Sequence, residues 1–305
     1  MMRYAVLVFL GACSYGILST FVKIAYDRGF TVDEVSGSQM LLGVLLMWTV
    51  ALIARRRGGA VAGGTPKQRP TVRETLLLLA VGCATGMTGM LYYNSLQHVP
   101  ASVGILLLFQ FTWMGVLLEA LLTRTLPGKD KLLSLLLLLA GTVLAGNILS
   151  QGAASYPLKG VLLGLLAALT YTLFIVFSGR TATRLPSLTR SAIMTTGGAL
   201  TVMLVYPPVF LTNGALLNGL LPFSLLLALF GAIIPTLFFA IGVPHIGGGL
   251  ATILSAAELP TAVFMSGFVL REHVSGLQWI GVAVILAGIA YPEWRRMRAL
   301  RNQVG

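Results

Sequence analysis

The stretch GLATILSAAELPTAVFMSGFVLRE, residues 249–272, carries the feature that decides this fold. Up to residue 270 it is apolar apart from a few hydroxyls and one acid, Glu258, which Pro260 follows two residues later. At a rise of about 1.5 Å per residue, such a segment is long enough to cross a bilayer, with Glu258 near the middle. A charge there costs at least ~2.5 kcal/mol, so we expect Glu258 to face a cavity or a partner.

An earlier stretch, ASVGILLLFQFTWMGVLLEALLTR (101–124), aligns with 249–272 and places Gln110 opposite Glu258. Similar phrases follow each of them, LLLLLAGTVLAG (135–146) and GVAVILAGIAY (281–291). The order of the matches predicts two repeats of about five spans, residues 1–150 and 151–305. Because five is odd, the second repeat should enter the membrane inverted, and inverted repeats place a binding site at their interface near mid-membrane.

Composition places the whole chain in a bilayer. Of its 305 residues, 56% are hydrophobic and 10% are charged, and the mean hydropathy is +0.88. A soluble domain has about a quarter of its residues charged, so this chain cannot cover itself with polar groups. The sequence predicts an all-α integral membrane protein with about ten transmembrane helices. The expected spans are 4–26, 33–54, 72–93, 100–123, 131–149, 158–178, 189–212, 222–243, 249–270 and 276–292, the fifth and tenth being the shortest.

The basic residues predict the orientation. With the N-terminus in the cytoplasm, the cytoplasmic segments hold 17 Lys and Arg residues and the outer segments hold 4. This asymmetry satisfies the positive-inside rule and accounts for the net charge of +12 without nucleic acid as a partner. We therefore expect a multi-pass protein of the cytoplasmic (inner) membrane with both termini in the cytoplasm. The basic, Gly/Pro-rich loop 55–71 should be mobile.

The sequence resembles the EamA-type branch of the drug/metabolite transporter (DMT) superfamily over nearly its whole length. The resemblance rests on SAAELP (255–260), HVPASVGILLL (98–108), GLQWIGVAVILAG (276–288) and the doubled five-span plan. It implies the inverted-repeat fold of that superfamily and transport of small metabolites such as amino acids, nucleosides or drugs. The family has a Glu-Pro-like pair at the first-repeat position that matches Glu258 and Pro260. This chain has Gln110, Phe111 and Thr112 there, so a mechanism with two symmetric carboxylates does not carry over.

Glu258 and Pro260 are the leading candidates for a substrate site. Proline has no N–H, so the carbonyl of Ala256 should lose its helical donor and be free to accept a hydrogen bond from a substrate. A carboxylate and a free carbonyl one turn apart suit an ammonium group or a proton. The alternative is a neutral Glu258 that is hydrogen-bonded between helices and serves only packing.

Further candidates are polar or aromatic side chains at mid-membrane depth. The amide of Gln110 can donate and accept hydrogen bonds, which suits a neutral or zwitterionic ligand; the alternative is a hydrogen bond between helices. Trp113 could form a stacking wall of the site; the alternative is a position facing lipid. Tyr15 and Ser19 lie on one stripe of the first span with Lys23, which should snorkel to the outer surface. The remaining candidates are Tyr171, Gln39 and Trp48 within the bilayer, and Tyr93 near the outer face, where it could gate the site or belong to the aromatic belt. Gly82, Gly86 and Gly89 should serve close helix packing.

The sequence therefore favours a secondary transporter that exports or exchanges a small neutral or zwitterionic metabolite, an amino acid or similar compound, by alternating access. The alternative is a membrane-embedded enzyme acting on a lipid or isoprenoid substrate. Such an enzyme needs clustered acids, His or Arg at the water interface, and the nine acids of this chain form no such cluster. We expect no enzymatic activity, no cofactor and no metal. Protons are the candidate coupling ion, and a monomer could suffice because the repeat already supplies two halves.

Overall fold

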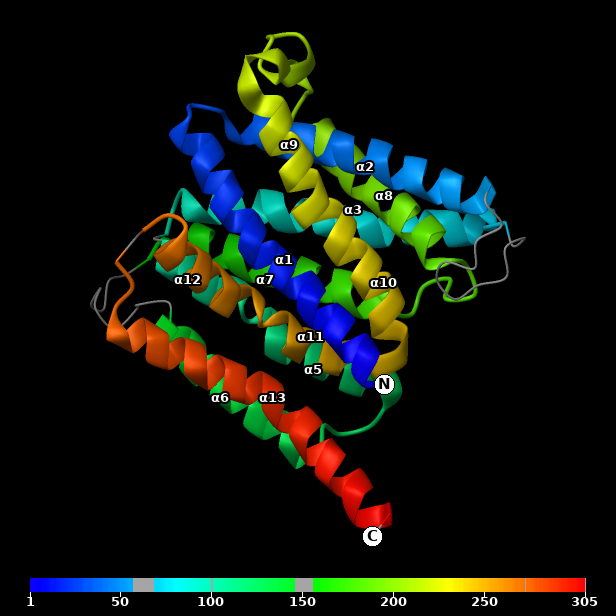
Figure 1. Ribbon diagram of the computed structural model, residues 1–305, viewed down its shortest axis with the longest axis vertical. Coiled ribbons are helices and arrows are strands. Elements are labelled where there is room, and N and C mark those ends of the chain that lie inside the picture. The colour runs from blue at the N-terminus through cyan, green and yellow to red at the C-terminus, as the bar shows by residue number, and fades with distance from the viewer. Residues whose placement is uncertain (57–68, 100, 146–155, 272, 305) are drawn as a thin grey trace.

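The computed structural model describes residues 1–56, 69–99, 101–145, 156–271 and 273–304, and within these ranges every regular element is helical (Figure 1). Most of loop 55–71 lies outside the described residues. The α-helices are α1 (Met2–Asp27), α2 (Val32–Arg56), α3 (Val72–Leu96), α4 (Ala101–Leu108), α5 (Phe111–Thr123), α6 (Lys129–Ala145), α7 (Leu158–Ser178), α8 (Ser187–Val205), α9 (Leu221–Leu227), α10 (Ile234–Ile246), α11 (Gly248–Ser255), α12 (Glu258–Phe268) and α13 (Gly276–Val304). One 3-10 turn, η2 (Val209–Leu211), and two π-helical segments, η3 (Leu216–Leu220) and η4 (Ala228–Ile233), complete the described elements.

These elements confirm the expected fold class. Eight helical segments in the described residues are long and apolar enough to cross a membrane. The fifth and tenth expected spans correspond to α6, with 17 residues, and to the apolar part of α13, Gly276–Pro292. Two expected boundaries shift, because α8 ends at Val205 before two prolines and the eighth span lengthens to Leu216–Ile246.

The fourth and ninth spans, which the sequence analysis gave as single segments, are each broken into two half-helices. The first breaks after Leu108 and the second after Ser255, at equivalent positions of the two repeats. At both breaks the backbone bonds tighten to the i to i−3 pattern: the N–H of Gln110 bonds the carbonyl of Leu107, and that of Ala257 bonds the carbonyl of Leu254. Pro260 then falls in the first turn of α12, where a missing N–H costs little.

Contacts between helix ends identify one side of the bundle. Tyr4 near the start of α1 stacks on His245 near the end of α10, with ring centroids 3.7 Å apart. Arg295 of α13 pairs with Asp130 of α6 at 3.3 Å. We call this the terminal side, because the N-terminus lies there, and the opposite side the far side.

Helix α1 runs through the middle of the bundle, with α10 and α12 packed against it, and α3 packs across α7 and α8 (Figure 1). Glycine permits the closest crossing: a Cβ on Gly86 of α3 would lie 2.7 Å from the carbonyl oxygen of Gly198 of α8. The expectation of close packing is therefore confirmed for Gly82 and Gly86. Helices α6 and α13 lie side by side at one edge (Figure 1).

A buried arginine joins three helices near the terminal side. Arg190 of α8 is 1% exposed, and its guanidinium donates to the carbonyl oxygens of Ser178, Thr181 and Ala240. Ser178 is the last residue of α7, and Pro244 cannot donate to the carbonyl of Ala240. The guanidinium thus satisfies carbonyls that a helix end and a proline leave without their helical donors.

Candidate functional site

A central cavity of about 270 Å³ lies among α1, α2, α3, α7, α8 and the start of α12. Broken helices in both repeats meet near it, the arrangement that transporters use to build a site at mid-membrane. Its wall combines apolar atoms with a few polar groups, as ligand sites do. The lining residues are Tyr15, Leu18, Ser19, Val22, Ser36, Gln39, Met40, Thr85, Gly86, Thr88, Gly89, Met90, Tyr92, Tyr93, Leu108, Tyr171, Val202, Tyr206, Gly231 and Glu258.

Glu258 is the first residue of α12 and reaches the cavity from the break in the ninth span. Its Oε2 atom accepts a hydrogen bond of 3.3 Å from the hydroxyl of Tyr171 on α7. Gly16 brings α1 against this break, because a Cβ at that position would lie 2.5 Å from the carbonyl oxygen of Glu258. The close crossing places the preceding residue on α1, Tyr15, edge-on against Tyr171 with ring centroids 5.9 Å apart.

Two other polar groups of the cavity wall have no partner within the described part of the chain. The hydroxyls of Tyr15 and Thr85 are buried and make no hydrogen bond. A buried hydroxyl without a partner costs about 1–3 kcal/mol, so such groups are rare unless a ligand or water satisfies them. Together with Glu258, they give the cavity two hydroxyls and one carboxylate that can bind a polar cargo.

Six of the ten residues that the sequence analysis selected line this cavity. They come from α1, α2, α3, α7 and α12 and are Tyr15, Ser19, Gln39, Tyr93, Tyr171 and Glu258. The structure therefore brings together side chains that are up to 243 positions apart in the chain, as from Tyr15 to Glu258. Their role in binding stays a prediction.

The other four selected residues are not among those that line the cavity. The amide of Gln110 turns back to its own helix, where Nε2 donates to Leu106 at 2.8 Å and Oε1 accepts from Trp113 at 2.8 Å. Trp113 is 37% exposed on the outside of the bundle. Trp48 donates to the hydroxyl of Thr196, and Pro260 is buried in the first turn of α12.

The sequence analysis missed a polar face of α3. Thr85, Thr88 and Tyr92 recur at spacings of three and four residues, which is one face of a helix, and all three line the cavity. The hydroxyls of Thr88 and Thr170 lie 2.9 Å apart, linking α3 to α7. Gly89, expected to serve close packing, lies on the same face, and a Cβ there would meet no atom within 4 Å. The hydroxyl spacing was a readable signal in the sequence.

A second hollow, which we call the vestibule, lies next to the cavity on the far side. It shares Tyr93 and Tyr206 with the cavity. Its other lining residues lie at the end of α1, the start of α2, the end of α3 and just after α8, and they are Tyr26, Val32, Asp33, Gln97 and Pro207. The hollow that adjoins the cavity therefore lies toward the far side of the bundle.

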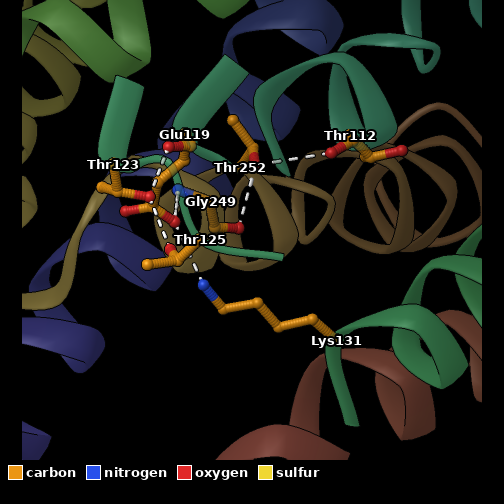
Figure 2. A network of polar contacts seen from close by, with 7 residues as sticks. All are labelled: Thr112, Glu119, Thr123, Thr125, Lys131, Gly249 and Thr252. Carbon is orange, nitrogen blue, oxygen red and sulfur yellow. Dashed lines mark hydrogen bonds and ion pairs between the residues drawn. The ribbon is translucent and has the colours of Figure 1, made fainter. Parts of the chain in front are cut away.

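On the terminal side, a polar network holds α5, α6 and α11 together, as Figure 2 shows. The Oε2 atom of Glu119 accepts from the N–H of Gly249 at 2.8 Å and from Nζ of Lys131 at 3.0 Å. Thr252 adds a longer bond of 3.5 Å to the carbonyl of Thr112. A carboxylate at the N-terminus of α11 is favoured by the helix dipole, so this network stabilises closure of the terminal side.

A second ion pair lies on the same side, between Arg184 and Glu74. Arg184 belongs to the loop between α7 and α8, and Glu74 to the first turn of α3. Their hydrogen bond raises the pKa of the Arg184 guanidinium above its usual value, so Arg184 stays ionised at physiological pH. The pair is exposed to solvent and adds little stability by itself.

Comparisons with known proteins agree with this architecture. The model of the EamA-like transporter family matches residues 2–147 and again residues 158–291. A protein of Synechocystis sp. named "Uncharacterized transporter sll1319" is 24% identical over 318 residues, covering 95% of this chain and 93% of that protein. A Bacillus subtilis protein named "Uncharacterized transporter YcbK" is 23% identical over 310 residues, covering 98% and 95% of the two chains.

A solved structure described as "Crystal structure of protein" has the same fold. It aligns with a TM-score of 0.70 at 19% identity, covering 93% of this chain and 97% of that chain. At this level of identity the likeness supports the fold alone.

Proposed function

Because this chain belongs to the EamA-like transporter family, we propose that it is a secondary transporter that exports or exchanges a small amine-bearing metabolite, such as an amino acid, by alternating access. The observation that carries the proposal is Glu258, a carboxylate in the central cavity, whose lining also holds two hydroxyls that lack partners in the described residues. An ammonium group suits this wall because it donates hydrogen bonds and accepts none. It can form a charge-assisted hydrogen bond to the carboxylate and donate to the oxygens of the two hydroxyls.

Alternating access draws support from the asymmetry of the two sides. The vestibule adjoins the cavity on the far side, while the network of Glu119, Lys131 and Gly249 holds the terminal side together. With the terminal side in the cytoplasm, this arrangement is the outward-facing state. The cycle then needs a second state in which the terminal-side contacts part and the vestibule closes.

Glu258 is also the group through which protons would be coupled. Among the described residues that line the cavity it is the one acid, so a proton and an ammonium group would compete for the same carboxylate. Competition of this kind makes binding of each ligand weaken binding of the other. Protons that move inward down their gradient would then drive the cargo outward.

The test is counterflow in proteoliposomes, with pooled amino acids and amines loaded inside and a labelled member added outside. Wild type should accumulate the label transiently, and Glu258→Gln should reduce this by about 10-fold or more, since it removes a charge-assisted bond inside a low-dielectric site. Asp130→Asn makes the same kind of change at an exposed acid far from the cavity and should exchange like wild type.

Equal exchange by wild type and Glu258→Gln would assign Glu258 to helix packing and remove it from the site. If no member of the pool exchanges in wild-type vesicles of verified protein content, the carrier proposal itself is wrong.

A further inference from the structure

The path from the far side to Glu258 carries charge of one sign. The chain has 21 Lys and Arg residues and 9 Asp and Glu residues. Even so, the described residues that line the cavity and the vestibule include two acids, Glu258 and Asp33, and no Lys, Arg or His. A path lined by one sign of charge concentrates ions of the opposite sign, here cations.

Tyrosines add to the same preference. Tyr15, Tyr92, Tyr93 and Tyr171 line the cavity together with Glu258, and the hydroxyl of Tyr171 donates to Glu258 at 3.3 Å. Tyr93 reaches into the vestibule as well. Aromatic faces carry negative potential and attract ammonium groups within about 6 Å, and the attraction grows when the pair is desolvated.

A substrate carboxylate, by contrast, finds no cationic partner in this wall. In transporters a half-helix N-terminus can bind such a group, but the N-terminus of α12 already carries the carboxylate of Glu258. The corresponding start of α5 is at Gln110, whose amide is occupied by Leu106 and Trp113. Arg190 lies outside the lining of both hollows, and its guanidinium is engaged with backbone carbonyls. A second carboxylate near Glu258 would therefore be buried without a charge partner, which disfavours its binding.

Resting on the proposed function, we infer that the preferred cargo is a small monocationic amine that lacks a carboxylate, with an apolar or aromatic body held among the tyrosines. The amine binds Glu258 and the hydroxyl oxygens around it, and the cavity of about 270 Å³ limits the size of the body. This replaces the neutral or zwitterionic metabolite that the sequence favoured, and among the amine-bearing metabolites of the proposed function it disfavours amino acids.

The test uses pairs of ligands that differ by one carboxylate. Isoamylamine, phenethylamine and tryptamine are compared with leucine, phenylalanine and tryptophan as competitors of counterflow and by calorimetric titration of the purified protein. In each pair that binds, the amine should bind about 10-fold tighter or more, since the amino acid buries an unpaired charge. The acid 3-phenylpropionate keeps the ring and carboxylate of phenylalanine without its amine and should not bind.

The outcomes separate the inference from the function beneath it. If the amino acids bind as tightly as the amines, or if 3-phenylpropionate binds, the inference is overturned and the carrier stands. If no amine exchanges while another compound class does, the inference is likewise overturned. If nothing exchanges in any class, both the inference and the proposed function fall.

The vestibule offers an independent check of the charge argument. Asp33→Asn should weaken phenethylamine uptake about 3-fold at low ionic strength, and the loss should shrink at high salt because the attraction is screened. Asp27→Asn removes the same charge from an exposed residue at the end of α1 that is outside the vestibule lining and should have less effect. An equal effect of both variants, or a salt-independent loss at Asp33, would contradict steering along this path.

Discussion

At the residue scale, two glycines about one turn apart on α3 have different roles. Gly86 touches the backbone of Gly198 and allows α3 and α8 to cross closely. Gly89 also lines the cavity, but a Cβ there would meet no atom within 4 Å. Gly82, Gly86 and Gly89 recur at helical spacings of four and three residues, so the sequence could not separate Gly89 from the two glycines that pack. The difference depends on which way α3 is rotated against its neighbours.

Gly89→Leu should therefore keep the fold and shrink the site. We expect unchanged or slightly higher thermal stability, since leucine favours a helix by about 0.8 kcal/mol over glycine. Counterflow of tryptamine should fall by about 10-fold while isoamylamine is less affected, because the added side chain fills space that the larger body needs.

Gly86→Leu is the matched control, since its side chain would collide with the backbone of α8. It should lower the unfolding temperature in detergent or abolish expression. The assignment of Gly89 to the cavity fails if both variants unfold alike, or if Gly89→Leu transports tryptamine normally.

At the element scale, the breaks in the fourth and ninth spans give the site its shape. Each break turns a continuous span into two half-helices, and the second one delivers Glu258 to the cavity. The proline at 260 signalled an interruption of the ninth span, but no proline marks the fourth. The fourth span is therefore interrupted without a proline. Gln110, which the sequence aligns with Glu258, lies at this break, and its amide donates to the carbonyl of Leu106 in the preceding half-helix α4.

The N-terminus of the half-helix α11 also takes part in the terminal-side network, because Gly249 donates to Glu119. This contact gives a local prediction. Glu119→Gln keeps the shape of the side chain but loses the charge that holds Gly249 and Lys131. Backbone hydrogen exchange in residues 247–255 should become about 10-fold faster, since charge-assisted bonds are roughly twice as strong as neutral ones.

Hydrogen exchange read by mass spectrometry checks this prediction, with Asp130→Asn as the control for loss of an acid on the same side. Lys131→Met should produce a smaller change, because the bond from Gly249 to Glu119 remains. Unchanged exchange in Glu119→Gln would show that packing alone closes this side.

At the scale of the whole molecule, the helices alternate so that both described ends of the chain lie on the terminal side, with α6 and α13 paired at one edge (Figure 1). Charge predicts that this side faces the cytoplasm. We expect a fluorescent protein fused to the C-terminus to fluoresce in cells and an alkaline phosphatase fused there to be inactive, since 17 of the 21 basic residues then stay inside. Active phosphatase at the C-terminus would show that the terminal side faces outward, and the described state would then be inward-facing.

The sequence by itself determined the class of fold and the span order, and it predicts the depth of Glu258. These depend on long runs of hydropathy and on the cost of a charge in a bilayer, which each residue carries with it wherever its helix lies. The same reasoning found six cavity residues, among them Tyr15, Tyr171 and Gln39, as polar groups at mid-membrane depth.

The tertiary structure alone decided which polar groups share a cavity and which satisfy themselves elsewhere. Gln110 and Glu258 are matched by sequence, yet one bonds its own helix and the other meets Tyr171. From the sequence Arg190 would be assigned to the surface. In the structure it is buried and donates to carbonyls that Pro244 and the end of α7 leave without helical donors. Such choices depend on helix rotation and on the partners that neighbouring helices present, and no local pattern of residues encodes either.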